Sequence, residues 1–378
     1  MSMKIKTVQV PELIYLTTYL MQSLSSATGL MNLKNGSEYW KTIPETLKDR
    51  INNDYYYLQK GLKLYNTSHI STYSSPKDLV KKIGSTQLFH FKGKGVPLVF
   101  IPSHINKAYI LDFSESCSLI KKLKIAGVNP YLIEWNQPKE EKCFNFEDYL
   151  NNHLKPLLEF VKEREGRKVI VAGYCMGGLF ALAAAQLFPD LVDGLITLST
   201  PWNFHTPGFL DYPLSPYYAA LLNFLYKNSP SISKHLIQLI FYFLKYREIN
   251  NKYIKLGKGE CQPDEFAMLE NWANDGLDIS TTLFLECMQD LVIQNKSYLN
   301  EWRINGEIIT PDKLKQKSFC GVALNDKITP ILSTLPLGIA FRKSVLKAVN
   351  SGHLGMIISD KHSISPSLIE WIKLNFEH

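Results

Sequence analysis

The chain reads Val-Ile-Val-Ala-Gly-Tyr-Cys-Met-Gly-Gly over residues 169–178, and an apolar run follows from Leu179 to Leu187. The β-branched residues predict a buried strand and the apolar run predicts a helix, so the chain turns sharply between them. A turn of this kind strains its central residue, Cys175, and needs small residues two positions to either side, which Gly173 and Gly177 provide. N–H groups at the start of the helix then face Cys175 and favour a thiolate and a developing oxyanion. The stretch predicts a nucleophilic cysteine, with a buried structural cysteine as the alternative.

Length and composition exclude several classes of protein. The 378 residues, 45% of them hydrophobic, are enough to bury a full α/β core. The six cysteines form no CxxC pair and no histidine-rich spacing, which predicts no metal site, no disulfide framework and a reducing cytoplasm. The formal charge of +7 is scattered; it would tolerate an anionic substrate but predicts no nucleic-acid partner. Residues 13–31 are interrupted by polar side chains and predict neither a signal peptide nor a membrane span.

The order of expected elements predicts an α/β-hydrolase fold, with a mostly parallel central sheet, a helical lid insertion and a helical N-terminal region. Residues 1 to about 90 are expected to be helical, and 91–378 to form the catalytic domain. From Val96 onward, short apolar strands alternate with longer helical stretches, as in a parallel sheet with crossovers. The expected strands are 97–102, 130–135, 168–172, 194–199, 319–324 and 344–349, and the expected helices 114–125, 146–165, 176–188 and 365–376.

The alternation stops between about residues 201 and 312, where an insertion into such a sheet normally forms a lid. Two runs in it, 217–226 and 235–246, are apolar nearly all round. Both an ordinary buried lid core and an exposed apolar surface fit this pattern. An exposed surface would serve a dimer contact, an apolar product or a lipid-like surface.

A nucleophilic cysteine needs a base, and the base needs an orienting carboxylate. In α/β-hydrolases these follow the nucleophile in the order acid, then histidine, on loops after late strands. Asp326 follows the expected strand 319–324, and His353 follows the expected strand 344–349. We therefore expect Cys175, Asp326 and His353 to act together. The competing histidines are His104, His205 and His362.

The expected oxyanion hole combines the backbone N–H of Met176 with that of Ile105, which lies on the loop after the first expected strand. Thiolates exchange readily with thioesters, because the attacking and leaving groups are alike. A cysteine at position 175 therefore favours acyl transfer from a thioester over plain hydrolysis.

Several stretches resemble the polyhydroxyalkanoate synthase family. The box Gly-Tyr-Cys-Met-Gly-Gly at 173–178 fits the Gly-x-Cys-x-Gly-Gly pattern of that family. Further matches are 105–112, 131–135, 325–330 and 351–355, so the resemblance covers roughly 96–358, whereas the first 90 residues match only loosely. Glu134 departs from the pattern, since the family usually has Asp before the tryptophan.

This resemblance implies that Cys175, assisted by His353, takes the acyl group of an (R)-3-hydroxyacyl-CoA and passes it to a growing polyester. Asp326 would orient His353 or also help to deprotonate the 3-hydroxyl of the next monomer, and the sequence leaves open which group takes that proton. It implies no cofactor beyond the CoA thioester substrate. The implied partners are the polyester or its granule surface and a homodimer or second synthase subunit, in the cytoplasm or on a granule. Two alternatives stay open: a cysteine thioesterase or polyester hydrolase, and a non-catalytic granule- or membrane-surface protein. No stretch identifies substrate-binding residues.

Overall fold

The computed structural model describes residues 44–68, 73–136, 141–208, 224 and 229–376. These residues divide into two compact units, 44–68 with 238–274, and the described residues of 73–237 with 275–376. Among the described helices, none is long and apolar enough to cross a membrane.

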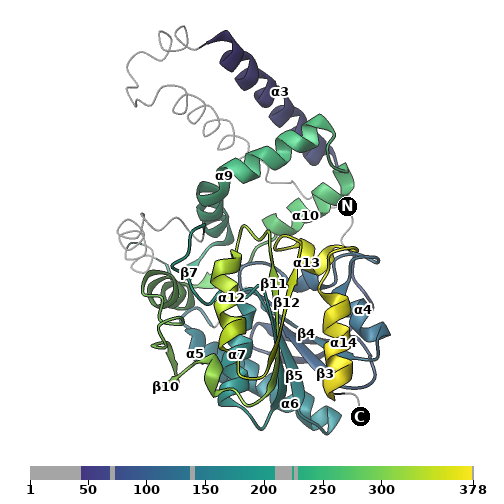
Figure 1. Cartoon of the computed structure of the whole chain (residues 1–378), viewed down its shortest axis with the longest axis vertical. Helices are drawn as coiled ribbons and strands as arrows, with labels where there is room; N and C mark the ends of the chain where they lie inside the picture. The colour runs from purple at the N-terminus through teal and green to yellow at the C-terminus, as the bar shows by residue number, and fades with distance from the viewer. Residues whose placement is uncertain (1–43, 69–72, 137–140, 209–223, 225–228, 377–378) are drawn as a thin grey trace. The chain divides into compact units, whose positions relative to one another are not determined.

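The larger unit is built on one eight-stranded sheet with the order β1-β2-β4-β3-β5-β6-β11-β12 (Figure 1). Strands β1 and β2 pair antiparallel, as do β2 and β4, and every pairing from β4 to β12 is parallel. The strands are β1 Asp78–Ile83, β2 Thr86–His90, β3 Pro97–Ile101, β4 Asn129–Glu134, β5 Val169–Tyr174, β6 Val192–Leu198, β11 Lys317–Ala323 and β12 Ser344–Val349. The six predicted strands are therefore confirmed, each to within two residues at either end.

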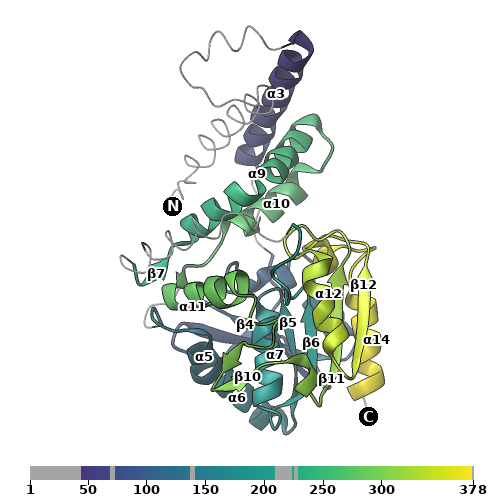
Figure 2. The same ribbon diagram turned by 60° about the vertical axis from the view of Figure 1, so that its left-hand side comes forward.

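Helices cover both faces of this sheet (Figures 1 and 2). Helix α4 (Leu119–Ile125) contacts α14 (Ser365–Phe376) on one face, and α7 (Gly177–Leu187) packs against β5 and β6 on the other. The predicted helix 146–165 is one helical stretch in three parts: α5 (Phe146–Tyr149), the π-helical η3 (Leu150–Leu154) and α6 (Lys155–Glu165). Strands β3 and β5 are buried along their whole length, because helices lie on both sides of them.

The prediction of helix up to about residue 90 is wrong for 78–90, where the chain forms the hairpin β1–β2. Its turn contains Gly84, whose φ of 53° lies in the left-handed region. Strand β2 alternates buried and half-buried side chains, which is the period of a strand. Residues 45–67 do form a helix, α3 (Glu45–Thr67), and residues 1–43 lie outside the described part.

The smaller unit contains α3, residues 238–258 of α9 (Lys234–Lys258), and α10 (Pro263–Asn274). Helices α3 and α9 cross in backbone contact, because a Cβ at Gly61 would lie 2.0 Å from the Tyr253 carbonyl oxygen. Buried residues that include Leu58, Tyr242 and Phe266 form the core. Tyr242 thus belongs to a buried core, as one interpretation of the run 235–246 expected. Of the run 217–226, only Phe224 is described, and it is exposed.

The part of the insertion that belongs to the larger unit, within 201–237 and 275–312, consists of short elements. It contains α11 (Thr281–Glu286) and the π-helical η5 (Cys287–Ile293). It also contains two small antiparallel pairs, β7 (Ser231–Ile232) with β8 (Ile279–Ser280), and β9 (Arg303–Ile304) with β10 (Glu307–Ile308).

Candidate active site

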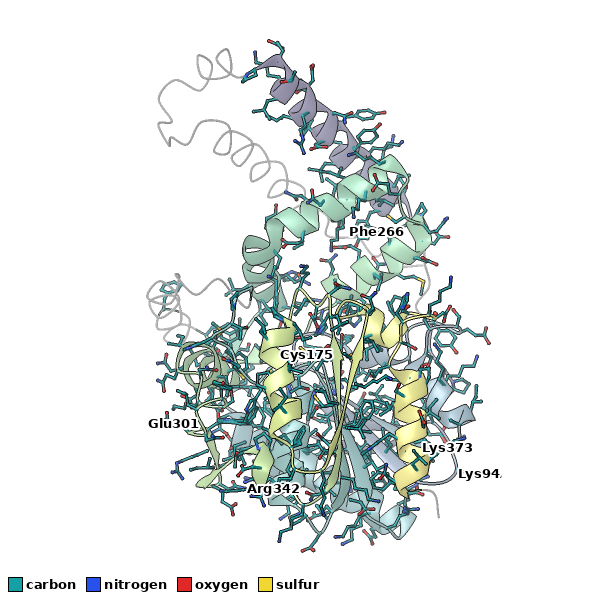
Figure 3. All side chains as sticks on the ribbon, viewed as in Figure 1. Lys94, Cys175, Phe266, Glu301, Arg342 and Lys373 are labelled. Carbon is teal, nitrogen blue, oxygen red and sulfur yellow. The ribbon has the colours of Figure 1, made fainter. Side chains whose placement is uncertain are left out.

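Cys175 lies at the carboxyl end of β5, in the sharp turn that leads into α7 (Figure 3). Its φ is +54°, a conformation that non-glycine residues adopt at a cost of about 1–3 kcal/mol. Its backbone N–H donates to the Leu198 carbonyl oxygen at 2.9 Å, so the neighbouring strand β6 holds the turn in place. The side chain is partly exposed and its thiol is free. The predicted strained turn is therefore present.

The glycines around Cys175 are required by close backbone packing. A Cβ at Gly173 would lie 2.3 Å from the Cα of Gly178, and one at Gly177 would lie 2.0 Å from the carbonyl oxygen of Ile101. A Cβ at Gly178 would lie 1.8 Å from the Thr200 hydroxyl oxygen. The expectation of small residues two positions before and after Cys175 is thereby confirmed.

Asp326 and His353 lie on the loops that follow β11 and β12, and their side chains meet. Nδ1 of His353 is 2.7 Å from Oδ2 of Asp326, and both side chains are almost completely buried. The Asn325 amide donates to the Asn350 side-chain oxygen at 2.7 Å, which joins the two loops. Cys175 lies near enough to His353 for its charge to act on the pKa of the imidazole. The structure thus joins His353 to Asp326, and Cys175 lies near enough to influence the imidazole.

The Asp326 carboxylate accepts four hydrogen bonds. Oδ1 accepts the backbone N–H groups of Ile328 and Thr329, both at 2.8 Å. Oδ2 accepts the Thr329 hydroxyl at 2.9 Å in addition to His353. Sequence reasoning missed Thr329, because a threonine three positions after an aspartate is common in ordinary turns. These bonds fix the carboxylate in one orientation.

His353 and Asp326 shift each other's pKa. Burial alone would lower the pKa of His353, but the negative charges of Cys175 and Asp326 and its hydrogen bond to Asp326 raise it to about 10. Burial alone would raise the pKa of Asp326, but the imidazolium and the hydrogen bonds hold it below its ordinary value. A histidine that is held by a carboxylate and lies near a cysteine is the arrangement that activates a cysteine nucleophile.

The predicted oxyanion donors lie on the two expected segments. Met176 caps the N-terminus of α7, directly after the cysteine, and its sulfur lies 3.9 Å from Sγ of Cys287 in η5. Ile105 lies on the loop after β3, where its carbonyl accepts the N–H of Leu277 at 2.9 Å. The N–H of Ile105 donates to the Ser103 hydroxyl at 3.2 Å, so this donor is engaged within its own loop.

The competing histidines lie in other environments. His104 is stacked at 4.1 Å on Trp135 in the core, where burial lowers its pKa to about 3. The exposed His205 lies near the carbonyl oxygens of Val292 and Ile293, and His362 is exposed.

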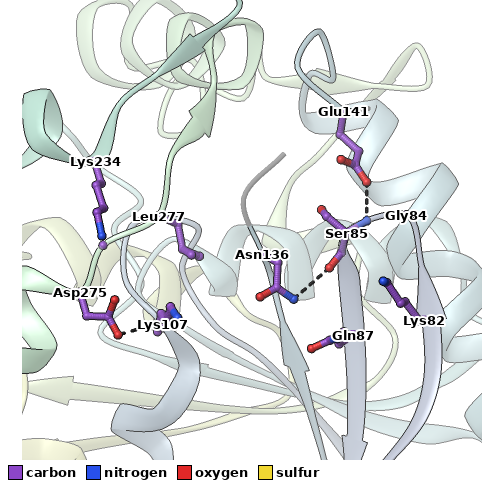
Figure 4. Close-up of a pocket in the computed structure, with 11 residues that line it drawn as sticks. Lys82, Gly84, Ser85, Gln87, Lys107, Asn136, Glu141, Lys234, Asp275 and Leu277 are labelled. Carbon is purple, nitrogen blue, oxygen red and sulfur yellow. Dashed lines mark hydrogen bonds and ion pairs between the residues drawn. The ribbon is translucent and has the colours of Figure 1, made fainter. Parts of the chain in front are cut away.

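A separate cavity of about 520 Å³ opens beside β1 and β2 (Figure 4). Its charged lining residues are Lys82, Lys107, Lys234, Glu141 and Asp275, and Cys175 is not among its lining residues. Lys107 pairs with Asp275 at 3.8 Å. Among the described residues, no group of three or more His, Cys, Asp or Glu side chains could hold a metal ion.

Comparison with known proteins gives consistent results. Residues 136–359 match the family model described as alpha/beta hydrolase fold. The poly(3-hydroxyalkanoate) polymerase subunit PhaC of Haloarcula marismortui is 24% identical, over 79% of this chain and 67% of that protein. The PhaC subunit of Allochromatium vinosum is 27% identical over 83% of this chain and 93% of its own length. Against the PhaC subunit of Haloferax mediterranei, the chain spans only 65% of the relative's length.

Solved structures support the same fold. The thioesterase domain from the curacin biosynthetic pathway aligns with a TM-score of 0.50 and 11% identity, over 80% of this chain and 100% of that domain. At this identity the match shows the fold alone. The predicted fold and the predicted resemblance to polyhydroxyalkanoate synthases are confirmed. The chain belongs to the alpha/beta hydrolase fold family, and PhaC polymerase subunits are among its relatives.

Proposed function

We propose that this chain is an acyltransferase that polymerises (R)-3-hydroxyacyl-CoA into polyhydroxyalkanoate and releases CoA. The observation that carries the proposal is the strained Cys175, whose charge acts on the hydrogen-bonded His353–Asp326 pair, in a relative of PhaC polymerase subunits. A cysteine without a chemical role would have no physical need for a backbone conformation that a glycine adopts without strain.

In the first half-reaction, the Cys175 thiolate attacks the thioester carbonyl of the substrate. The tetrahedral oxyanion forms at the N-terminus of α7, where the N–H of Met176 is the nearest donor in sequence. Ile105 is the second proposed donor, and its N–H must first leave the Ser103 hydroxyl. The carbon–sulfur bond to CoA then breaks, and the CoA thiolate takes the proton of the His353 imidazolium. The acyl group remains on Cys175 as a thioester, so little energy is lost in the exchange.

In the second half-reaction, the 3-hydroxyl of another hydroxyacyl group attacks the Cys175 thioester. His353, now neutral, accepts the hydroxyl proton, and the Cys175 thiolate is regenerated as the ester forms. Asp326 is a poor candidate for this proton, because its two oxygens already accept four hydrogen bonds. In this scheme Asp326 orients the imidazole and stabilises its positive charge.

The proposed function also assigns a lid, partners and a location to this chain. The insertion 201–312 would act as the lid that admits monomer and excludes water. The named relatives are polymerase subunits, so we propose that this chain also works in an assembly, as a homodimer or with a second subunit. Its location would be the cytoplasm or the surface of a polyester granule. If water instead of a hydroxyl reached the thioester, the same residues would make a hydrolase.

The test incubates the purified full chain with (R)-3-hydroxybutyryl-CoA, follows free CoA and identifies the acyl product. Cys175→Ala should stop CoA release, whereas the matched control Cys143→Ala removes an exposed thiol and should leave it unchanged. Polyester as the product supports the proposal. Free hydroxy acid would show a hydrolase instead, and CoA release by Cys175→Ala at the normal rate would remove Cys175 from the mechanism.

A further inference from the structure

Tyr174 is a buried tyrosine that contacts His353 in two ways. It ends β5 one residue before Cys175, and only 3% of its surface is exposed. Its hydroxyl donates a hydrogen bond to the backbone carbonyl oxygen of His353 at 3.2 Å. Its ring centroid lies 5.0 Å from that of the imidazole, with 36° between the planes. The same side chain therefore restrains both the backbone and the ring of His353.

The hydrogen bonds of the histidine loop show why this contact matters. The N–H of Met356 donates to Gly352, and that of Ile357 donates to Leu354, so both bypass the carbonyl between them. The Tyr174 hydroxyl donates a hydrogen bond to this carbonyl, which belongs to His353. A buried carbonyl without a donor is unfavourable, so loss of the hydroxyl would favour movement of the loop that carries His353.

The phenol is suited to a positioning role because it stays protonated. Burial, and then the negative charges of Cys175 and Asp326, raise the pKa of Tyr174 well above its ordinary value. It therefore remains a hydrogen-bond donor throughout the pH range in which the site would work, and it does not compete with His353 for protons.

We infer that Tyr174 is a positioning residue: it joins the strand that carries Cys175 to the loop that carries His353, and so keeps the imidazole aligned with the thiol. Asp326 holds one ring nitrogen, which leaves the ring free to tilt about that bond unless the Tyr174 ring limits it. The inference rests on the proposed function, since it concerns the same cysteine and histidine.

The test measures alkylation of Cys175 by iodoacetamide across neutral and mildly alkaline pH, and needs no acyl substrate. Labelling is followed by the mass of the peptide that contains Cys175, with the exposed Cys143 as an internal reference. In Tyr174→Phe we expect alkylation to slow by about tenfold at neutral pH, because a small displacement of a catalytic pair has a large effect on rate. The midpoint of the pH profile should move to higher pH, since the imidazolium partner is less well aligned.

The matched control is Tyr131→Phe. Tyr131 is a buried tyrosine of β4 whose hydroxyl bonds to Glu165, so the substitution removes a buried hydroxyl without touching the histidine loop. Its alkylation profile should equal that of the wild type. Equal slowing in both variants, or a Tyr174→Phe profile that matches the wild type, would overturn the inference.

Further measurements distinguish a loss of positioning by Tyr174 from a loss of folding and from a failure of the proposed function. Rates are normalised to the folded fraction of each variant, and Tyr174→Leu, which lacks the ring as well, should react more slowly than Tyr174→Phe. A Leu variant as fast as the wild type would also overturn the inference. In CoA release, Tyr174→Phe should lower kcat by about tenfold with KM unchanged. If the wild type alkylates normally but releases no CoA, the proposed function fails while the role of Tyr174 remains tested.

Discussion

Glu286 is expected to make the free energy of unfolding fall as the pH rises, by an amount that follows from its raised pKa. It ends α11, directly before η5 and Cys287, and its Oε2 accepts the N–H of Phe146 at 2.7 Å. Phe146 is the first residue of α5, so this carboxylate fastens the insertion to the core. Burial raises the pKa of Glu286 to about 7; the N–H of Phe146 opposes that rise, and nearby carboxylates that include Asp290 add to it.

The raised pKa of Glu286 determines the direction in which stability changes with pH. The ordinary value is 4.5, so between about pH 4.5 and 7 the folded protein binds a proton that the unfolded chain does not. The contribution of Glu286 to stability is therefore complete below about pH 4.5 and is lost as the pH rises towards 7. At about 1.4 kcal/mol per pH unit the full loss is about 3 kcal/mol, which partial exposure reduces to about 2 kcal/mol.

Glu286→Gln removes the titration but keeps a side-chain oxygen that can accept the N–H of Phe146. We expect the variant to match the wild type near pH 5 and to exceed its free energy of unfolding by about 2 kcal/mol at pH 8. Urea unfolding followed by tryptophan fluorescence at several pH values measures this. The matched control is Glu147→Gln, since Glu147 also accepts a backbone N–H, from Asn305 at 2.7 Å, but near the surface. Parallel pH curves for Glu286→Gln and the wild type would refute the reasoning.

Three substitutions test the site itself. Thr329→Val removes one hydrogen-bond donor to Asp326, so kcat for CoA release should fall about tenfold while the protein stays folded. An unchanged kcat would mean that the backbone donors alone hold the Asp326 carboxylate. Asp326→Asn should slow formation of the acyl-enzyme about 10⁴-fold, measured by mass spectrometry after quenching, and normal turnover would remove Asp326 from the mechanism. Gly178→Ala places a methyl group 1.8 Å from the Thr200 hydroxyl oxygen and should lower the free energy of unfolding by about 2 kcal/mol; wild-type stability in urea would contradict the packing argument.

The central strands were predictable because their burial leaves a local mark in the sequence. Residues 97–101 and 169–174 are buried throughout, and such strands read as short apolar runs rich in β-branched residues. The hairpin β1–β2 was missed because it lies at the edge of the sheet. Strand β1 is mostly exposed and carries Lys81 and Lys82, so its sequence resembles that of a solvated helix.

The positions of Cys175, Asp326 and His353 at the ends of strands were predictable for a different reason. In a parallel sheet the carboxyl ends of the strands meet at one edge, so chain order and position after a strand suffice to bring three distant residues together. Tyr174 and Thr329 lack such a signal. Their roles depend on contacts with His353 and Asp326 across the chain, and a tyrosine at the end of a buried strand or a threonine in a turn is common without any such contact.

The histidine is the point at which these contacts converge. Asp326 holds its Nδ1, the Tyr174 hydroxyl holds its backbone carbonyl, and the Asn325–Asn350 pair joins the two loops. Cys175, by contrast, is held by the backbone, through the β6 hydrogen bond and the glycines that surround it. The nucleophile is thus fixed by the sheet, and the base is fixed by side chains on two loops. Loops open more readily than central strands. Substitutions outside the three reacting groups should therefore affect the chemistry most when they disturb the orientation of His353.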